Sequence, residues 1–480
     1  MLLPNQCAQA RTSRDPRFDG LFFVLVKSTK IFCRNTCKVR LPLEKNVSYA
    51  SSAQLALTQG YRPCLRCRPD SAPNSSAWMG THTSLLRAMA LLIERRNSSI
   101  EDIATSLGIS SRYLHKLFIE HLSVSPKRYR LYQQVLIAKT LLQQTRLSVE
   151  QVATSVGFNS ARQLQQHVKA ELKLTPTQIR NNPMPGNTQQ NCEATQLSSD
   201  ITLLLSYRPP YDWPLVQGFL SRRAINGNEL FTPSGFTKVL RLANKHTEQT
   251  KQTPQVTETL SVPVNIVHCP KEHGFTVSFN AAYSEYTIEI TRIISRMLDL
   301  HADPLVINHA LEQAGLNQNQ LIPGLRLPGV ASVFEAGCRA ILGQQVSVTA
   351  AVNKVNELYQ HFASEHDRAF PSAKTVASSD LLFLKMPARR RQSLIDFAAY
   401  CAQEEQETFD SEAMLNIKGI GPWTVNYIDL RAMGNTDIYL ASDLVIKQQL
   451  AKYAAQNQVL HAALAAPWRS YFTLQLWSLA

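Results

Sequence analysis

The feature that most constrains the fold of this chain is a set of four cysteines near the N-terminus, arranged as two close pairs. Three residues separate Cys33 from Cys37, and 26 residues further on Cys64 and Cys67 are separated by two. Two close pairs of thiolates, brought together by a loop, are the usual way to hold a tetrahedral zinc ion. Unrelated core thiols are the alternative, but they seldom show this spacing. The pattern predicts a small domain stapled by one zinc ion.

The length and composition predict several domains. With 480 residues the chain is too long for a single core, and about three domains are expected. No apolar run approaches the roughly 20 residues that a membrane span requires, and the apolar start is too short for a signal peptide. We therefore expect a cytoplasmic protein without a membrane partner. Its nine cysteines are then metal ligands, nucleophiles or core residues before they are disulfides.

The charge of the chain is unevenly distributed. Residues 1–180 contain 26 Lys and Arg against 10 Asp and Glu, a net charge of +16, whereas residues 181–480 contain 24 against 26, a net charge of −2. A basic front half indicates a polyanionic partner, attracted by neutralising its phosphates. Any affinity of the back half for a nucleic acid must come from local features.

The local patterns divide the chain into five segments and predict a multidomain α+β protein. The expected segments are a small zinc-stapled α/β domain, an all-helical domain, a polar linker, a small α+β domain and an all-α domain. Their bounds are 1–78, 84–180, 181–199, 200–285 and 286–480.

The all-helical segment contains an internal repeat, in residues 99–129 and 147–180. Each copy has a short helix, a glycine turn at Gly108 or Gly157, and a second helix that opens on Ser and Arg. Such a second helix can enter a DNA major groove, although a plain helical bundle is the alternative. The two copies resemble the AraC-type DNA-binding domain. Candidate DNA contacts are Arg112, His115 and Lys116 in the first copy, and Arg162 and Gln163 in the second.

The stretch around the four cysteines, residues 29–70, resembles the N-terminal domain of the Ada-type DNA alkylation-response proteins. The resemblance implies that Cys33, the first ligand, accepts a methyl group from a DNA methylphosphotriester. Zinc keeps such a sulfur deprotonated, and its methylation removes one negative charge that opposes the DNA. The ion would therefore be both structural and thiolate-activating. A purely structural zinc is the simpler alternative.

Near the C-terminus residues 417–430 read IKGIGPWTVNYIDL. Gly419 and Gly421 remove the side chains around the turn, and Pro422 suits the first position of a helix. N–H groups at the start of a helix can bind a phosphate. The stretch thus fits a helix-hairpin-helix in which Gly419, Gly421 and Thr424 contact DNA. An ordinary tight turn between packed helices is the alternative.

Residues 200–480 resemble the AlkA-type 3-methyladenine DNA glycosylases of the helix-hairpin-helix superfamily. The likeness extends through YRPPYDWPLVQGFLSRRAI, GLRLPGVASVFEAGCRAILGQQVSV and PWRSYFTLQLW. It implies that Asp443 stabilises the sugar cation that forms when the bond to a flipped base breaks. The alternative for Asp443 is a helix N-cap. The resemblance also implies a pocket of aromatic side chains, which could individually be core residues: Phe219, Trp423, Tyr427 and Trp477.

Two departures from the family's archetype and two comparisons with related proteins refine this expectation. Gln345 stands where the family's archetype inserts a leucine into the space left by the base, and Leu444 replaces a tyrosine, giving a drier pocket wall. Trp423 occupies the place of the Schiff-base lysine of strand-cleaving relatives, and Lys418 lies on the wrong side of the hairpin, so no lyase step is expected. Ada-type proteins usually carry an alkyltransferase Pro-Cys-His-Arg site, and no such stretch occurs here. The sequence around Cys192, Cys269, Cys338 and Cys401 does not match such a site. Cys7 is expected in a loose N-terminus.

Two hypotheses follow from these patterns. In the first, the chain is a monofunctional glycosylase for alkylated bases fused to an alkylation sensor, acting as a monomer on double-stranded DNA, both damaged and promoter. In the second, it is a transcription activator whose C-terminal region only binds damage. A general DNA-binding scaffold, the third possibility, leaves Asp443 and the four cysteines unexplained.

Overall fold

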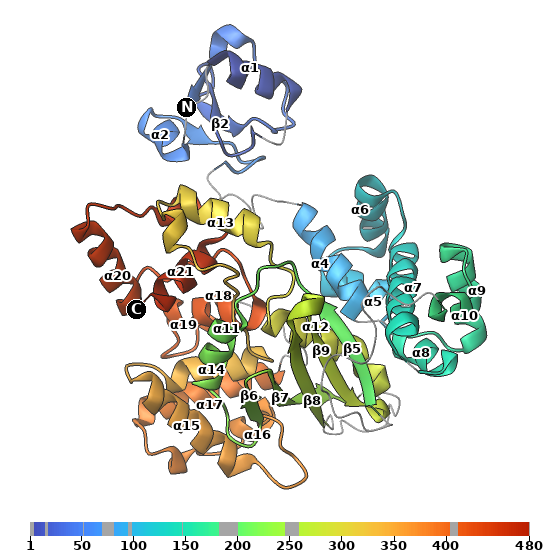
Figure 1. Ribbon diagram of the computed structural model, residues 1–480. Helices are drawn as coiled ribbons and strands as arrows, with labels where there is room; N and C mark the ends of the chain where they lie inside the picture. The colour runs from blue at the N-terminus through green and yellow to red at the C-terminus, as the bar shows by residue number, and fades with distance from the viewer. Residues whose placement is uncertain are drawn as a thin grey trace. The chain divides into compact units, whose positions relative to one another are not determined.

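The computed structural model describes most of the chain (Figure 1). The described residues are 4–14, 18–50, 52–69, 81–94, 98–145, 147–181, 200–244, 259–403 and 411–479. The expected linker at 181–199 lies outside these ranges beyond residue 181, as does Cys192. The chain divides into two compact units, residues 1–134 and 135–480. No helix in the described ranges is both long and apolar enough to cross a membrane.

The N-terminal part contains a four-stranded sheet with strand order β3-β1-β2-β4. The strands are β1 (Phe23–Val26), β2 (Ile31–Arg34), β3 (Val47–Ala50) and β4 (Arg62–Pro63), accompanied by helices α1 (Pro4–Ser13) and α2 (Ala53–Thr58) and the 3-10 turn η2 (Glu44–Asn46). Side chains alternate between the faces of a strand. The paired residues Val24 and Cys33 accordingly lie in the cysteine-containing core, and the paired residues Leu25 and Phe32 lie in the other core.

The helical repeat forms as expected. The first copy consists of α4 (Thr81–Glu94), α5 (Ile100–Ser106) and α6 (Ser111–Leu122), and the second of α8 (Val149–Val156), α9 (Ala161–Leu172) and α10 (Pro176–Arg180), with α7 (Pro126–Gln144) between them. Ser99 and Ser148 cap the first helix of each copy in a capping box. Gly108 and Gly157 have positive φ angles of 67° and 85°, which side chains rarely adopt.

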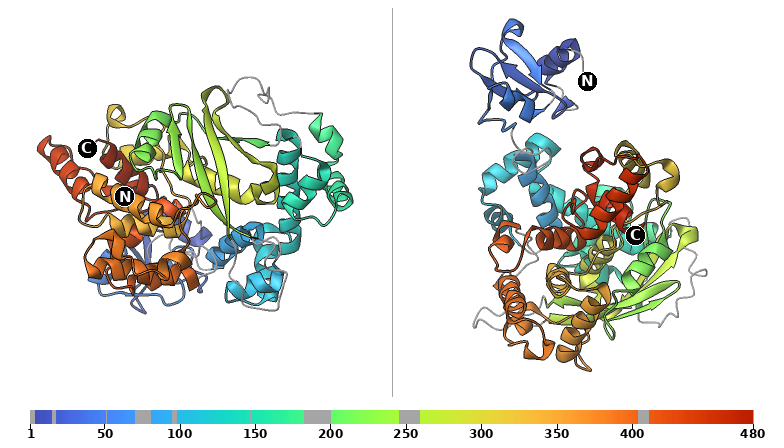
Figure 2. Two further views of the ribbon diagram at one scale, coloured as in Figure 1. Left: turned by 90° about the horizontal axis from the view of Figure 1, so that it is seen from below. Right: turned by 90° about the vertical axis from the view of Figure 1, so that its left-hand side faces the viewer.

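The α+β region is a five-stranded antiparallel sheet with strand order β5-β9-β8-β7-β6. Its strands are β5 (Asp200–Ser206), β6 (Glu229–Thr232), β7 (Gly235–Ala243), β8 (Thr259–Cys269) and β9 (Gly274–Asn280). Helix α11 (Trp213–Ser221) follows β5, and the 3-10 turns η4 (Pro270–Glu272) and η5 (Ala281–Tyr286) flank β9. The further views show how the strands twist across this sheet (Figure 2).

The remaining chain is helical. Its longer helices are α12 (Thr287–Met297), α13 (Pro304–Gln313), α14 (Val333–Leu342), α15 (Val348–Phe362), α17 (Ala388–Gln403), α20 (Leu444–Ala455) and α21 (Arg469–Ser478). Shorter segments are η6 (Gln318–Gln320), α16 (Ala373–Ala377), η7 (Leu382–Leu384), α18 (Ser411–Leu415), α19 (Pro422–Ile428), the π-helical turn η8 (Asp429–Met433) and η9 (Ala462–Ala465).

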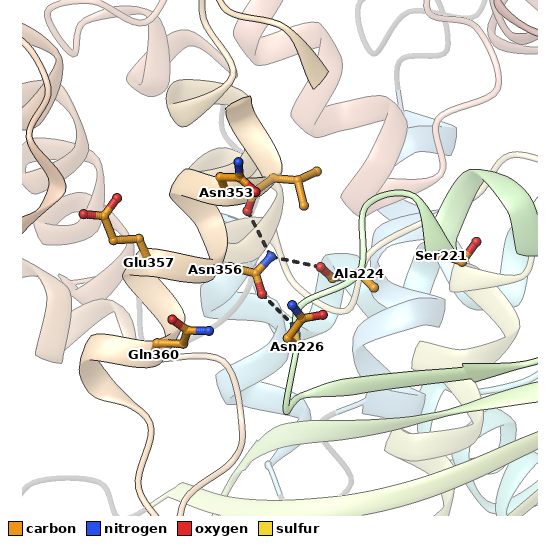
Figure 3. A pocket seen from close by; sticks show the side chains of 8 residues that line it. Ser221, Ala224, Asn226, Asn353, Asn356, Glu357 and Gln360 are labelled. Carbon is orange, nitrogen blue, oxygen red and sulfur yellow. Dashed lines mark hydrogen bonds between the residues drawn. The ribbon is translucent and has the colours of Figure 1, made fainter. Parts of the chain in front are cut away.

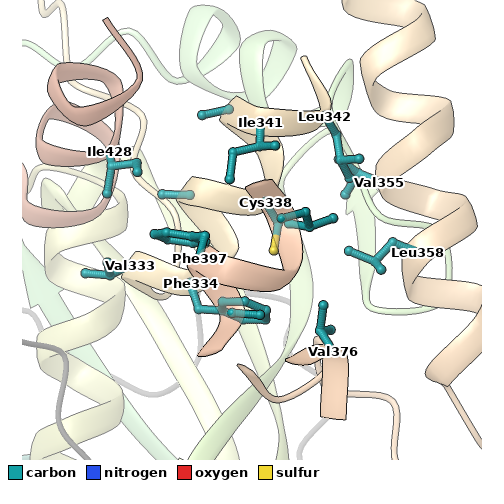
Figure 4. Close-up of a cluster of buried hydrophobic side chains, with 14 of the residues drawn as sticks. Val333, Phe334, Cys338, Ile341, Leu342, Val355, Leu358, Val376, Phe397 and Ile428 are labelled. Atoms are coloured by element: carbon teal, nitrogen blue, oxygen red, sulfur yellow. The ribbon is translucent and has the colours of Figure 1, made fainter. Parts of the chain in front are cut away.

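Helix α14 lies at the centre of the larger helical core (Figure 4). Its Phe334 stacks on Phe397 of α17, with ring centroids 6.1 Å apart. A Cβ added at Gly337 would lie 2.2 Å from the Phe397 ring, so the two helices approach closely only because residue 337 is glycine. Cys338, also on α14, is fully buried in this core.

Four charged side chains connect the sheet to α14. Lys238 on β7 contacts Glu229 at 2.6 Å and Glu335 at 3.2 Å, and Arg339 contacts Glu335 at 2.8 Å. Lys238 and Glu335 are each 1% exposed. Burial acts to raise the pKa of Glu335, but the attraction of Lys238 and Arg339 outweighs it and lowers the pKa to about 2. The two cations and two carboxylates therefore balance each other and connect the sheet to the helix.

Candidate active site and metal centre

Asp443 is held by N–H donors from three segments. It is the N-cap of α20, and its Oδ1 accepts from the backbone N–H groups of Val445 and Ile446 at 3.0 and 3.2 Å. Trp477 Nε1 on α21 donates to Oδ1 at 3.2 Å, and Trp423 Nε1 on α19 donates to Oδ2 at 3.3 Å. Asp443 is therefore a helix cap and also the point at which two pocket tryptophans meet. The carboxylate is partly exposed, so a ligand can reach it.

Two of the four predicted aromatic residues contact this carboxylate directly, and the other two are connected to it through their neighbours. Trp423 and Tyr427 are four residues apart on α19 and stack with ring centroids 5.2 Å apart and an interplanar angle of 20°. Trp477 is hydrogen-bonded to Asp443. The guanidinium group of Arg431 lies near both the Phe219 ring of α11 and the Tyr427 ring. All four rings are half-buried; Phe219 and Trp477 pack against one hydrophobic core and Tyr427 against the other.

Two arginines belong to this cluster, and neither was predicted from the sequence. The guanidinium carbon of Arg223 lies 3.8 Å from the Phe219 ring centroid, and that of Arg431 lies 4.8 Å from the same centroid. Arg431 also donates to the Tyr427 hydroxyl at 2.8 Å and to the Pro328 carbonyl. It is placed there by the π-helical turn η8, a type of distortion that is frequent at functional sites.

The glycine turn between α18 and α19 has the two-helix geometry expected of a hairpin. Gly419 has a φ of +89°, and a Cβ there would lie 2.2 Å from the Ser393 Oγ. Gly421, in contrast, has a φ of −107°, and a Cβ there would meet no atom within 4 Å. Gly419 is thus required by the fold itself, whereas the protein alone does not require glycine at 421. The open space at Gly421 is available to a molecule outside the chain.

Thr424 has a different role from the one expected. Its side chain is only 3% exposed, and its Oγ1 lies 3.3 Å from Gln344 Nε2, which also donates to the Gly419 carbonyl at 3.0 Å. The Thr424 side chain therefore connects the turn after α14 to the hairpin. We predicted that Thr424 contacts DNA, but its hydroxyl makes an internal hydrogen bond instead. The sequence did not single out Gln344.

The two positions that depart from the archetype are both at the surface. Gln345 is exposed and has a φ of +56°, so the turn after α14 projects this side chain outward. Leu444 is 68% exposed, directly beside Asp443. The expectation that Leu444 makes a drier pocket wall is not met in the free protein, because the side chain faces solvent.

The four cysteines converge as predicted. Their Sγ atoms all lie within 4.8 Å of one another, with Cys33 at the end of β2 and Cys64 just after β4. Sulfurs 2.3 Å from a tetrahedral zinc are about 3.8 Å apart, so the cluster fits one ion after a small contraction. Cys33, Cys37 and Cys64 are buried, and Cys67 is partly exposed.

Other cysteines differ from expectation. Cys7 was expected in a loose N-terminus, but it is buried on α1 in the same core as the cysteine cluster. Helix α1 is held there by Arg11, which donates to the Pro42 carbonyl at 3.0 Å and pairs with Glu44. Cys269 takes part in a disulfide, against the expectation of reduced thiols.

The candidate DNA contacts of the helical repeat lie mostly at the surface. Arg112, His115 and Lys116 are exposed on α6, and Arg162 is exposed on α9. Gln163 is half-buried, and its Oε1 accepts from the Asn159 backbone N–H at 3.2 Å. The amide oxygen of this side chain is therefore engaged at the start of α9.

A polar hollow of about 370 Å³ lies elsewhere, between α15 and the loop after α11 (Figure 3). Asn356 spans it, accepting from the Asn226 N–H at 2.7 Å and donating to the Ala224 carbonyl at 3.1 Å. None of the predicted site residues lines it. It is a packing feature of the joint between α15 and that loop.

Comparison with known proteins assigns the parts of the chain. Three family models match: the metal binding domain of Ada at residues 6–70, a helix-turn-helix domain at 103–182 and the AlkA N-terminal domain at 202–332. A probable bifunctional transcriptional activator/DNA repair enzyme AlkA of Mycobacterium tuberculosis is 30% identical, with 98% of this chain and 96% of that protein covered.

Two Escherichia coli proteins match different parts. DNA-3-methyladenine glycosylase 2 is 31% identical over 57% of this chain and 95% of its own length. The bifunctional transcriptional activator/DNA repair enzyme Ada is 32% identical over 37% of this chain and 49% of its own length. The chain belongs to the family of bifunctional AlkA proteins, which join an Ada-type zinc domain, a helix-turn-helix domain and an AlkA-type domain in one polypeptide.

Proposed function

We propose that the C-terminal region hydrolyses the bond between an alkylated base, such as 3-methyladenine, and its deoxyribose in double-stranded DNA. The observation that carries this proposal is the position of the Asp443 carboxylate, which accepts hydrogen bonds from both Trp423 and Trp477. A base must leave the helical stack to reach these aromatic side chains. Its sugar would then lie at the carboxylate.

The chemistry requires little from the protein besides charge and position. As the bond from C1′ to the base nitrogen breaks, the electron pair stays on the base and positive charge develops on the sugar. The Asp443 carboxylate stabilises that charge and orients a water molecule, which adds to C1′ and loses a proton. An N-alkylated base that is already cationic leaves as a neutral molecule, so no strong general acid is needed.

The aromatic rings supply recognition. The Trp423–Tyr427 stack presents a broad π surface against which a flipped purine can lie, and Trp477 borders the same carboxylate. We infer that Gln345, which is exposed in the turn after α14, occupies the space that the base vacates. We infer that phosphates bind at Gly421, where the chain leaves open space.

A strand-cleaving lyase step is not part of the proposal. Schiff-base chemistry needs an amine at the sugar. Trp423 faces Asp443 instead, and Lys418 is an exposed side chain on the other side of the hairpin.

Base release from methylated duplex DNA tests this proposal. Purified wild-type protein is expected to release 3-methyladenine and leave intact abasic strands, and Asp443→Asn to lose at least a hundredfold in rate. Asn keeps a cap acceptor for α20, so the variant should unfold at nearly the wild-type temperature. A wild-type protein that releases no base would refute the glycosylase proposal and leave only damage binding.

For the N-terminal domain we propose that Cys33 accepts a methyl group from a DNA methylphosphotriester. The sulfur attacks the methyl carbon, an S–C bond forms, the C–O bond to phosphorus breaks, and an ordinary phosphodiester anion is left. Bound zinc keeps the sulfur in its thiolate form. The product thioether is neutral, so the cluster becomes less repulsive to DNA and the adjacent helix-turn-helix units bind promoter DNA more tightly.

Peptide mass mapping after exposure to methylated DNA tests the acceptor assignment. Cys33 is 6% exposed, whereas Cys67 is the most accessible of the four ligands, so simple accessibility would favour Cys67. We expect the added methyl on Cys33 alone, at most one per chain, and absent after Cys33→Ser. A methyl on Cys67, or none at all, would reduce the domain to a structural zinc module. The same protein should act as a monomer in the cytoplasm, where its DNA lies.

A further inference from the structure

The start of α17 carries concentrated positive charge in the half of the chain that is otherwise slightly acidic. Residues 385–391 read KMPARRR and contain four cations and no acidic residue, although residues 181–480 have a net charge of −2. Arg389 is exposed, and Arg390 and Arg391 are half-buried. Among the residues that the structure describes, none of these three arginines forms an ion pair. Their charges are therefore available to an anion from outside the chain.

Ser393 fastens α17 to the glycine hairpin. Its Oγ donates to the Lys418 carbonyl at 2.6 Å and lies 3.0 Å from the Arg389 carbonyl oxygen, one turn earlier in α17. On the next residue of the turn, the Gly419 carbonyl accepts from Gln344 at 3.0 Å. The hairpin is thus held by α17 as well as by the turn after α14, and the start of α17 lies beside it.

The helical period decides which arginines share the face of α17 that contacts the hairpin. Residues three and four positions apart lie on one face of a helix, and their side chains tilt towards its N-terminus. Arg389 and Arg390 precede Ser393 by four and three positions, so they extend along this face. Arg391 precedes Ser393 by two positions, which places it about 200° away around the helix. Lys418, whose carbonyl Ser393 binds, is exposed and adds a third cation.

We propose that Arg389, Arg390 and Lys418 form a second phosphate-binding site, which holds the DNA backbone next to the phosphate bound at the hairpin. The proposal rests on the glycosylase function proposed above and adds an element, α17, that lies outside the hairpin. Guanidinium groups match the geometry of phosphate oxygens and bind them in pairs of hydrogen bonds. Such contacts position a protein on a duplex without reading its sequence. The site would thereby supply DNA affinity that the net charge of this half does not give.

This site should act on binding and not on bond breaking. The hydrogen-bond donors to Asp443 come from α19, α20 and α21. Loss of a charge from α17 should therefore raise KM and leave the single-turnover rate at saturating DNA nearly unchanged. Each phosphate contact on duplex DNA releases about 0.9 counterion, so a lost contact makes the plot of log kcat/KM against log salt less steep by about that amount.

The test compares Arg389→Gln with Arg391→Gln in base release from methylated duplex DNA between 50 and 200 mM salt. Both substitutions remove one charge from the same turn of α17, so Arg391→Gln is the matched control. Arg389→Gln should lower kcat/KM about tenfold at 50 mM salt and make the salt slope less steep by about 0.9. Arg391→Gln should keep the wild-type slope. Arg389→Lys, which keeps the charge, should keep it as well. The full-length chain is used throughout, so the basic front half contributes equally to every variant.

Each outcome decides the matter. A less steep slope in Arg389→Gln, with a wild-type slope in Arg391→Gln, supports the proposal. Equal changes of slope in both variants overturn it, because they indicate a general effect of net charge. A wild-type slope in Arg389→Gln also overturns it, even if the single-turnover rate falls, since that pattern indicates a packing defect. A wild-type protein that releases no base would refute the glycosylase function itself, and the salt slope of its binding to the methylated duplex would then test the phosphate site separately.

Discussion

The two hairpin glycines should respond in opposite ways to the same substitution. At Gly421 the backbone is extended and a Cβ meets nothing within 4 Å, so Gly421→Ala should cost about 1 kcal/mol or less through its N-cap position. At Gly419 the φ of +89° and the 2.2 Å approach to Ser393 Oγ should together cost roughly 2–4 kcal/mol. Ser393 cannot easily move away, because its Oγ donates to the Lys418 carbonyl at 2.6 Å.

The assay separates folding from DNA binding. Thermal unfolding should show near-wild-type stability for Gly421→Ala and a marked loss for Gly419→Ala. Base release at low DNA concentration, which reports kcat/KM, should fall about tenfold for Gly421→Ala, because the new methyl group occupies the space of a phosphate. Wild-type kcat/KM in Gly421→Ala would refute the placement of DNA at this turn, as would equal destabilisation by the two substitutions.

Two further predictions concern buried charge in the same half of the chain. Lys238→Met should lower the free energy of unfolding by roughly 3–5 kcal/mol, because it leaves Glu335 buried without one of its cations; denaturant titration measures this, and a loss below 1 kcal/mol would contradict it. For Asp299, burial raises the pKa to about 6, against hydrogen bonds from the Leu327 N–H and the Tyr471 hydroxyl. As pH rises from about 4 to 6, the carboxyl loses its proton in the unfolded state first, so the wild type loses stability that Asp299→Asn keeps. The free energy of unfolding of Asp299→Asn relative to wild type should therefore rise by about 3 kcal/mol by pH 7. A difference that does not depend on pH would disprove the raised pKa of Asp299.

The sequence allowed much of the fold and the metal centre to be predicted, because both rest on local signals. Capping serines and left-handed glycines recur in each copy of the helical repeat, and they act within a few residues. The spacing of the four cysteines similarly dictates their convergence on one ion. The pairing of Asp443 with Trp423 came from resemblance, and the hydrogen bond between them confirms their proximity.

Other features could not be predicted because they depend on distant packing. Arg431 lies in a π-helical turn, from which its side chain contacts Phe219. No residue spacing in the sequence predicts such a turn. Lys238 is a charged residue in a strand, normally expected at the surface, and only the position of Glu335 on α14 makes its burial possible. Thr424 was predicted to contact DNA because it follows the hairpin glycines, yet its hydroxyl lies within hydrogen-bond distance of Gln344 in the turn after α14.

The central claim is that Asp443 stabilises positive charge on the sugar, and binding of a charged sugar analogue measures this directly. A duplex carrying a pyrrolidine ring, cationic at neutral pH, at the damaged position is compared with one carrying the neutral tetrahydrofuran ring. The wild-type protein should bind the pyrrolidine duplex at least tenfold more tightly, and Asp443→Asn should bind both duplexes equally. Equal preference for the cationic ring in wild type and Asp443→Asn would show that the carboxylate does not carry the catalytic charge stabilisation.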